Sequence, residues 1–137
     1  MIDISQKLGF LGEGIIGTAT RTNSEDTTTN FDFKIPDDNL YLTGAETVYT
    51  GCLWGDYITF QIIDIDNVLG YGVNTVLNQY VNKWYLDPNH NHKEVQTNYG
   101  GAIPKNIYIR IKYTAVQDTL AIDAKVAFNF YLHKILS

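Results

Sequence analysis

The chain has 137 residues and a formal net charge of −5, a length that suits one domain with a hydrophobic core of its own. Its 45% of apolar residues exclude a disordered chain, and its abundant Tyr, Thr, Asn and Gly are typical of strands joined by tight turns rather than of a helical bundle. The single cysteine excludes an internal disulfide framework, no apolar run reaches the roughly 20 residues of a membrane span, and the first residues do not resemble a signal peptide.

The N-terminal segment differs from the rest of the chain. Residues 8–17 carry five apolar side chains among four glycines, and polar residues follow up to position 30. Because glycine at this density favours neither helix nor strand, we predict an extended glycine-rich arm over residues 1–30 and a β-sandwich domain over residues 31–137. Two arrangements remain open: the arm covers an edge of its own sandwich, or it lies across a neighbouring subunit. The predicted partner-binding residues are Phe10, Leu11, Ile15 and Ile16.

Apolar and polar residues alternate strictly in several later segments, which predicts strands with one face on a core and one face toward water. The predicted strands cover residues 31–35, 40–50, 57–65, 94–99, 107–113 and 120–132. The last of these is long for a strand, so we expect a bend or bulge near Ala124. Residues 115–119 are expected to form a hairpin loop between the last two strands.

The stretch 73–84 fits two kinds of element. Its apolar residues recur at helical spacing, whereas residues 81–86 also fit a strand that ends before an Asp-Pro turn. We expect a short helix over residues 74–79 that runs into a strand. Seven or so strands with at most one short helix indicate an all-β fold, an antiparallel and jelly-roll-like β-sandwich.

Charge is distributed unevenly along the sequence. Residues 1–66 hold eleven acidic side chains against three basic ones, and residues 67–137 hold four against seven. The densest basic grouping, Arg110 and Lys112, is too small for a nucleic-acid footprint, so we expect no nucleic-acid partner. The asymmetry is typical of a solvated acidic surface, or of head-to-tail association in which the acidic half of one copy meets the basic half of the next.

Nucleophilic catalysis has few candidate residues. The serines are Ser5, Ser24 and Ser137, all outside the predicted sandwich, so a Ser-His-Asp arrangement finds no serine in the folded body. Cys52 precedes Leu-Trp and is expected to be a small buried hydrophobic residue rather than a nucleophile. The sequence therefore predicts no catalytic residue.

Two short motifs carry metal-ligating side chains. The segment from Asp64 to Asp66 resembles the start of a calcium loop, but the chain lacks the later ligands and the glycine of that loop, so a strand-ending turn is the expectation. His90 and His92 have the spacing of a ligand pair, yet a closed site needs more ligands, and an exposed polar turn is expected. We predict no metal and no cofactor.

Aromatic side chains offer one further kind of site. Small β-sandwiches that bind sugars use aromatic faces with polar residues at the rim, whereas most aromatic residues of a sandwich lie in the core or at subunit contacts. The candidate stacking residues are Trp54, Trp84, Tyr71, Tyr80, Tyr85, Tyr99 and Tyr108.

The segments GDYITFQIIDIDNVLGYG and VLNQYVNKWY, between residues 55 and 85, resemble small virion-associated proteins of tailed bacteriophages. The later segments IPKNIYIRIKYTA and AFNFYLHK are similar to the closing strands of those proteins, so the resemblance covers about residues 31–135. It implies a β-sandwich or jelly-roll protein that decorates a head or attaches to tail and collar structures, and it carries no functional residue across.

The leading hypothesis is therefore a non-enzymatic structural component of a bacteriophage virion, located in the virion. It would act by self-association as a homo-oligomer and by docking onto other virion structural proteins, with no membrane partner. The alternative is a carbohydrate-binding β-sandwich module, which includes a receptor-binding part of a virion. A small enzyme that uses Asp64 or Asp66 is the third reading.

Overall fold

The computed structural model describes residues 8–135, with side chains from residue 14 to residue 134. This part of the chain contains eight strands and no helix, and so none that could cross a membrane. The strands are β1 (Leu8–Ala19), β2 (Thr27–Lys34), β3 (Leu40–Thr50), β4 (Tyr57–Asp64), β5 (Thr75–Tyr85), β6 (His92–Gln96), β7 (Tyr108–Ala115) and β8 (Ala124–Ile135). The predicted all-β fold is confirmed.

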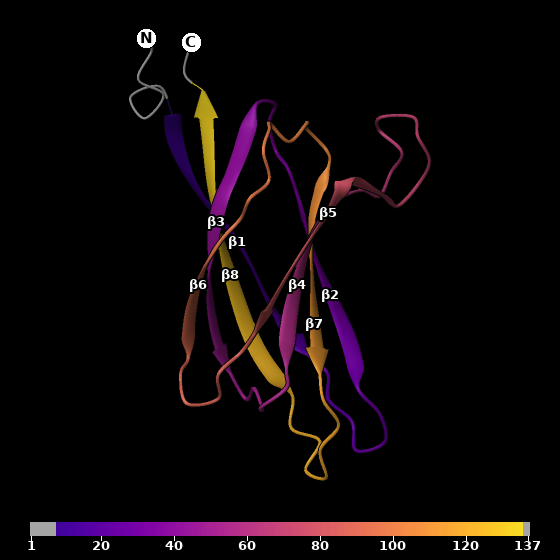
Figure 1. Ribbon diagram of the computed structural model, residues 1–137, viewed down its shortest axis with the longest axis vertical. Helices are drawn as coiled ribbons and strands as arrows, with labels where there is room; N and C mark the ends of the chain where they lie inside the picture. The colour runs from indigo at the N-terminus through magenta and orange to yellow at the C-terminus, as the bar shows by residue number, and fades with distance from the viewer. Residues whose placement is uncertain (1–7, 136–137) are drawn as a thin grey trace.

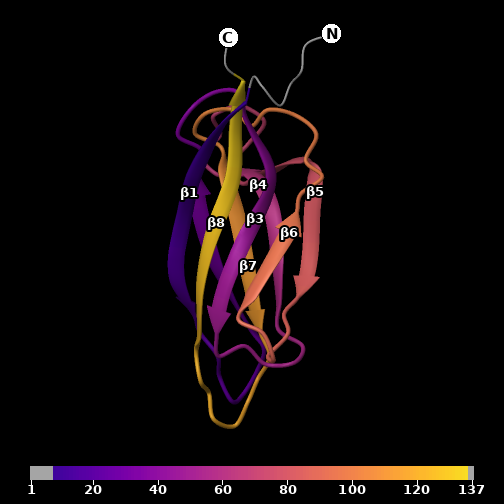
Figure 2. The ribbon, with the colours of Figure 1, turned by 90° about the vertical axis from the view of Figure 1, so that its left-hand side faces the viewer.

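The strands form two antiparallel four-stranded sheets that pack face to face (Figure 1). Sheet A has the strand order β1-β8-β3-β6 and faces the viewer in Figure 2, whereas sheet B has the order β2-β7-β4-β5. The pairs β1–β8, β2–β7, β3–β6 and β4–β5 make the chain a single long hairpin, folded over so that β8 also pairs with β3 and β7 with β4. This is the connectivity of an eight-stranded jelly roll.

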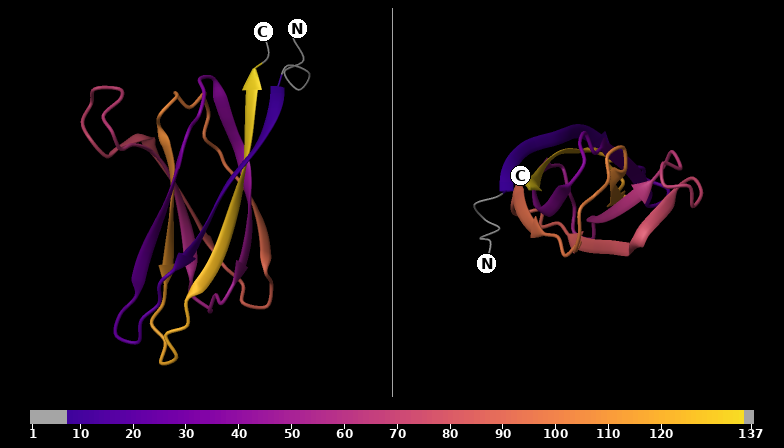
Figure 3. Two further views of the ribbon diagram at one scale, coloured as in Figure 1. Left: turned by 180° about the vertical axis from the view of Figure 1, so that it is seen from behind. Right: turned by 90° about the horizontal axis from the view of Figure 1, so that it is seen from above.

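The core lies between the sheets and follows from the alternation of the strands. In β7 every second side chain from Ile109 to Tyr113 is buried, and its intervening side chains face outward. Phe60 of β4 lies near the centre, with ring centroids 5.0 Å from Trp84, 6.4 Å from Phe128 and 6.3 Å from Phe130. The view from above in Figure 3 shows the two layers that enclose this core.

The segment expected as a glycine-rich arm contains a full strand of the sandwich. Residues 8–19 are β1, the edge strand of sheet A, and they pair with β8 along their whole length. A side chain at Gly17 would overlap the ring of Phe31, so this glycine lets β1 lie close against β2. β2 begins at Thr27, so the sandwich includes residues on both sides of the expected boundary at position 30.

The predicted helix over residues 74–79 is wrong, because these residues belong to the loop before β5 and to β5 itself. Asn78 and Gln79 adopt positive φ angles of 53° and 52° and form a bulge. Gln61 of β4 pairs with Val81 and Ile63 pairs with Val76, so one residue of β4 lies opposite residues 77–80 of β5. The bulge changes which residues of β5 face the core on its two sides. The apolar residues therefore recur at a spacing that resembles that of a helix.

The start of the last strand was also predicted wrongly. β8 begins at Ala124, and Leu120 and Ile122 are 73% and 56% exposed rather than inward. β7 and β8 lie in different sheets, so residues 116–123 form a connection between the sheets and not a hairpin. Because this connection belongs to no sheet, its alternating apolar residues do not all face the core.

A buried ion pair closes this end of the sandwich. The guanidinium of Arg21, in the β1–β2 loop, lies 2.6 Å from the carboxylate of Asp56, and both side chains are fully buried. Arg21 uses all five N–H groups, because it also donates to the carbonyl oxygens of Gly51, Val116 and Ile122. The pair thus ties the β1–β2, β3–β4 and β7–β8 loops together.

Asp56 is held ionised by its neighbours. Burial alone raises its pKa, but hydrogen bonds from Arg21, from the hydroxyl of Tyr113 and from two backbone amides bring the pKa below its ordinary value. An unfolded Asp titrates near about pH 3.9. The stability that Asp56 contributes is therefore complete above that pH, and it is lost as the pH falls through the lower folded pKa.

We expect Arg21→Met to lower the free energy of unfolding by about 3–5 kcal/mol at pH 7, because it leaves the Asp56 carboxylate buried and unpaired. Urea unfolding followed by tryptophan fluorescence measures this change. The matched control is Arg110→Met, since Arg110 pairs with Asp32 on an outer face and its loss costs about 1 kcal/mol or less. Equal losses in the two variants would contradict the role given to Arg21.

Candidate interaction surface

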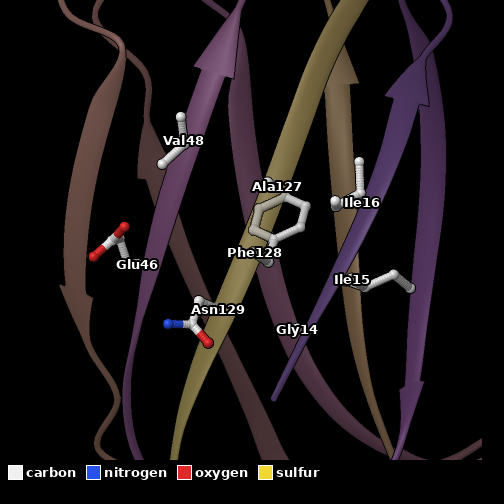
Figure 4. A pocket seen from close by; sticks show the side chains of 8 residues that line it. All are labelled: Gly14, Ile15, Ile16, Glu46, Val48, Ala127, Phe128 and Asn129. Atoms are coloured by element: carbon white, nitrogen blue, oxygen red, sulfur yellow. The ribbon is translucent and has the colours of Figure 1, made fainter. Parts of the chain in front are cut away.

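The outer face of sheet A carries a row of apolar side chains at its centre. Ile16 of β1, Ala127 of β8 and Val48 of β3 lie directly opposite one another across the three strands. Ile16 is 84% exposed and Val48 43% exposed. In Figure 4, Ile16 and Val48 stand on either side of Ala127 on the translucent ribbon. We call these three residues the apolar row.

The surface beside the apolar row is hollow. The neighbouring cross-strand row contains Gly14, Asn129 and Glu46. The two rows border an open hollow of about 480 Å³. Its lining residues are Gly14, Ile15, Ile16, Glu46, Val48, Ala127, Phe128 and Asn129 (Figure 4).

The alternation of β1 divides the residues expected to bind a partner. Ile15 is partly buried and packs against the core, whereas Ile16 points to solvent on the outer face. The side chains of Phe10 and Leu11 lie outside the described residues, although the backbone of both belongs to β1. Ile16 is thus the residue of this set that the described side chains place on an open surface.

The outer face of sheet B is basic. Its outward-facing basic residues are Lys34, Lys83, Arg110 and Lys112, from three strands. Arg110 forms a two-point ion pair with Asp32, and the Lys83 ammonium lies 4.0 Å from the ring centroid of Tyr57. Val81, which is 53% exposed, lies on the same face two residues from Lys83.

The acidic and basic halves of the sequence are not separate in space. Each sheet takes two strands from the acidic half and two from the basic half, because the folded-over hairpin interleaves them. Several opposite charges pair across the halves, as in Asp32 with Arg110 and Asp37 with Lys134. The outer faces still differ in charge: Glu46, Glu94 and Lys125 lie on sheet A, whereas the four basic residues and Asp32 lie on sheet B.

The motif at Asp64 and Asp66 forms a turn, as expected. The carboxylate of Asp64 is buried and accepts hydrogen bonds of 2.8 Å and 2.9 Å from the amides of Val68 and Leu69. Asn67 supplies a left-handed position with a φ of 59°. Asp66 accepts a hydrogen bond from the hydroxyl of Tyr108. Both oxygens of Asp64 are thus used to hold the β4–β5 loop.

The two expected histidines take different partners. The Nδ1 atom of His90 lies 2.8 Å from Asp87 in the β5–β6 turn. His92 begins β6 and lies beside Glu46 and Glu94, a group of possible metal ligands that does not include His90. The sequence did not suggest this group, because Glu46 is 46 residues from His92 and the register between β3 and β6 brings them together.

The aromatic candidates divide between core and surface. Trp84 is partly buried against Phe60, and the rings of Tyr80 and Tyr99 pack on each other with centroids 5.2 Å apart. Trp54, in the turn before β4, is 65% exposed. Of the other candidates, Tyr71 and Tyr85 are exposed and Tyr108 is partly so.

The described residues offer no activated nucleophile. Cys52 is buried, as expected, and its burial raises the pKa of the thiol to about 11. Ser24 lies in the β1–β2 loop with its hydroxyl near Thr22, and Ser5 and Ser137 lie outside the described residues. A thiol in this state has the character of a small apolar core group.

We expect native Cys52 to react with iodoacetamide at pH 8 at least tenfold more slowly than the same residue in urea, because the folded protein keeps the thiol buried and protonated. Mass spectrometry of timed samples measures the alkylated fraction. The urea-unfolded chain is the control, and equal rates in the two states would contradict a buried thiol.

No protein-family model and no curated protein matches this chain. Solved structures with a similar fold include the decameric BFDV capsid protein, at 10% identity and a TM-score of 0.47, with 92% of this chain and 97% of that chain covered. The infectious bursal disease virus Gx strain matches at 12% and 0.46 over 89% of this chain and 32% of that chain. Desmodium yellow mottle tymovirus matches at 8% and 0.38 over 93% and 89%. At these identities and TM-scores, the likenesses carry no weight for function.

Proposed function

We propose that this chain is a non-enzymatic structural component of a virion that acts through self-association. The observation that carries the proposal is the apolar row on the outer face of sheet A. Exposed aliphatic side chains in the middle of a flat, hollowed sheet face are typical of a surface that is covered in an assembly. Eight-stranded jelly rolls serve as capsid subunits but also as lectin and cupin domains, so the topology is compatible with this role without selecting it.

The proposed partner of the apolar row is the outer face of sheet B on a second copy. That face offers Val81 as an apolar contact, with Lys83 beside it. Glu46 lies two residues from Val48 on sheet A, so the apolar contact and the charge contact have the same spacing on both faces. A contact between two different faces is heterologous and builds rings or open chains of subunits.

Within the virion, we propose a bacteriophage particle as the setting. The chain would then serve as an auxiliary or decoration protein of the capsid, or as a protein of the tail or collar, and would dock onto other virion structural proteins. The basis is the resemblance of the segments between residues 55 and 135 to small phage virion proteins. No nucleic-acid or membrane partner is part of the proposal.

We expect Ile16→Asp to weaken self-association at least tenfold, because the variant puts a charge into the apolar contact. Sedimentation velocity over a concentration series measures the dissociation constant. The matched control is Val73→Asp, because Val73 is also an exposed aliphatic residue but lies in the β4–β5 loop, and this variant should leave association unchanged.

A charge exchange tests the orientation of the two faces. Glu46→Lys and Lys83→Glu should each weaken association, and an equimolar mixture of the two variants should form mixed contacts with the affinity of the wild-type protein. A wild-type chain that stays monomeric at every accessible concentration would overturn the self-association proposal. A dissociation constant that neither Ile16→Asp nor the charge variants change would overturn the proposed faces.

One observation favours a second candidate function, a carbohydrate-binding module that includes a receptor-binding role. Trp54 exposes an indole on a loop at one end of the sandwich, where a sugar ring could stack on it. A glycan array with the wild-type chain should then give a signal that Trp54→Ala removes, while Tyr71→Ala, at the opposite end, keeps it. An array without any signal would exclude this candidate.

A further inference from the structure

Three metal-ligating side chains meet on the outer face of sheet A. The ligand atoms of Glu46, His92 and Glu94 all lie within 4.8 Å of one another. The Nε2 atom of His92 is 3.6 Å from Oε2 of Glu46. We call these three residues the Glu-His-Glu group.

The register of two strands creates the group. Glu46 of β3 lies directly opposite Glu94 of β6, and His92 lies opposite Val48. His92 and Glu94 are two residues apart on one strand, so their side chains point to the same face. Two paired strands carry the three residues, which limits the freedom of the ligands before any ion binds.

Two carboxylates of the group, Glu46 and Glu94, lie directly opposite each other across the strand pair. Like charges directly opposite each other on a sheet are destabilising. The hydroxyl of Tyr131 lies 3.1 Å from Glu94 and 3.5 Å from Glu46, and it can donate only one proton. A cation between the carboxylates would remove the repulsion.

We propose that Glu46, His92 and Glu94 form a binding site for one divalent transition-metal ion of the Zn²⁺ class. Zn²⁺ takes imidazole nitrogen and carboxylate oxygen at about 2.0–2.2 Å, and three protein ligands leave room for water in the fourth position. Tetrahedral ligands at that distance lie roughly 3.4 Å apart, close to the 3.6 Å between His92 and Glu46. A rotation of the exposed Glu94 side chain completes the set. The imidazole favours Zn²⁺ over Ca²⁺ and Mg²⁺, which prefer all-oxygen sites.

The site stands apart from the proposed function, although Glu46 belongs to both. A bound ion and a lysine of a second copy would compete for the same carboxylate, so Zn²⁺ should weaken self-association. Metal binding is therefore measured on the Ile16→Asp variant, which leaves the Glu-His-Glu group intact. A failure of metal binding then leaves the association proposal standing, and the reverse also holds.

The test is isothermal titration of ZnCl₂ into tag-free Ile16→Asp protein at pH 7.5. We expect one ion per chain, with an affinity that falls at least tenfold on adding His92→Ala or Glu94→Gln. The matched control is His90→Ala, because His90 lies two residues away and outside the group. CaCl₂ titrated into the same protein should bind more weakly than Zn²⁺ and should not respond to His92→Ala.

Thermal unfolding with and without Zn²⁺ supplies a second readout. Saturating Zn²⁺ should raise the midpoint of the Ile16→Asp protein and of its His90→Ala derivative, but not of its His92→Ala derivative. Folding of each variant is checked by its circular dichroism spectrum. No Zn²⁺ binding, or binding that is lost equally with His90→Ala and His92→Ala, would overturn the proposed site.

Discussion

The ion pair between Arg21 and Asp56 is the constraint on which the rest of the structure depends. A buried guanidinium is tolerated only where every donor is satisfied, and here the β3–β4 and β7–β8 loops supply the acceptors for Arg21 of the β1–β2 loop. These loops connect strands of sheet A to strands of sheet B, so the pair fixes how the two sheets meet at this end. It also holds the chain directly after β1, the glycine-rich strand at the edge of sheet A.

The sequence predicts a strand well where alternation and sheet position agree. Residues 107–113 alternate strictly, and β7 lies between two other strands with one face on the core. The prediction fails where something other than the sheet sets the side-chain direction. The bulge at Asn78 and Gln79 imitates helical spacing, and residues 120–123 alternate in a connection that belongs to neither sheet. Glycines conceal β1 in the sequence, and at Gly17 the reason for the glycine, the ring of Phe31, lies in another strand.

The candidate surfaces, too, could be predicted from the sequence only in part. Ile16 was recognisable from the sequence, because an aliphatic residue in a polar and glycine-rich context needs a partner. The Glu-His-Glu group was not, since it exists only through the register of β3 against β6. The charge halves of the sequence were a misleading guide for the same reason. A folded-over hairpin pairs early strands with late ones, so proximity in the sequence says little about which charges share a face.

The position of β8 in sheet A affects how this chain folds as it is synthesised. β8 is the last strand to be synthesised, yet it lies between β1 and β3, and Leu8 pairs with Ile135. Until it emerges, sheet A lacks one of its two interior strands, and β1 and β3 keep unpaired edges. Folding of sheet A therefore waits for β8 and is slow relative to that of proteins with local contacts. Neighbouring nascent chains would expose these edges to one another and pair through them. A chaperone that covers the edges during synthesis would prevent this.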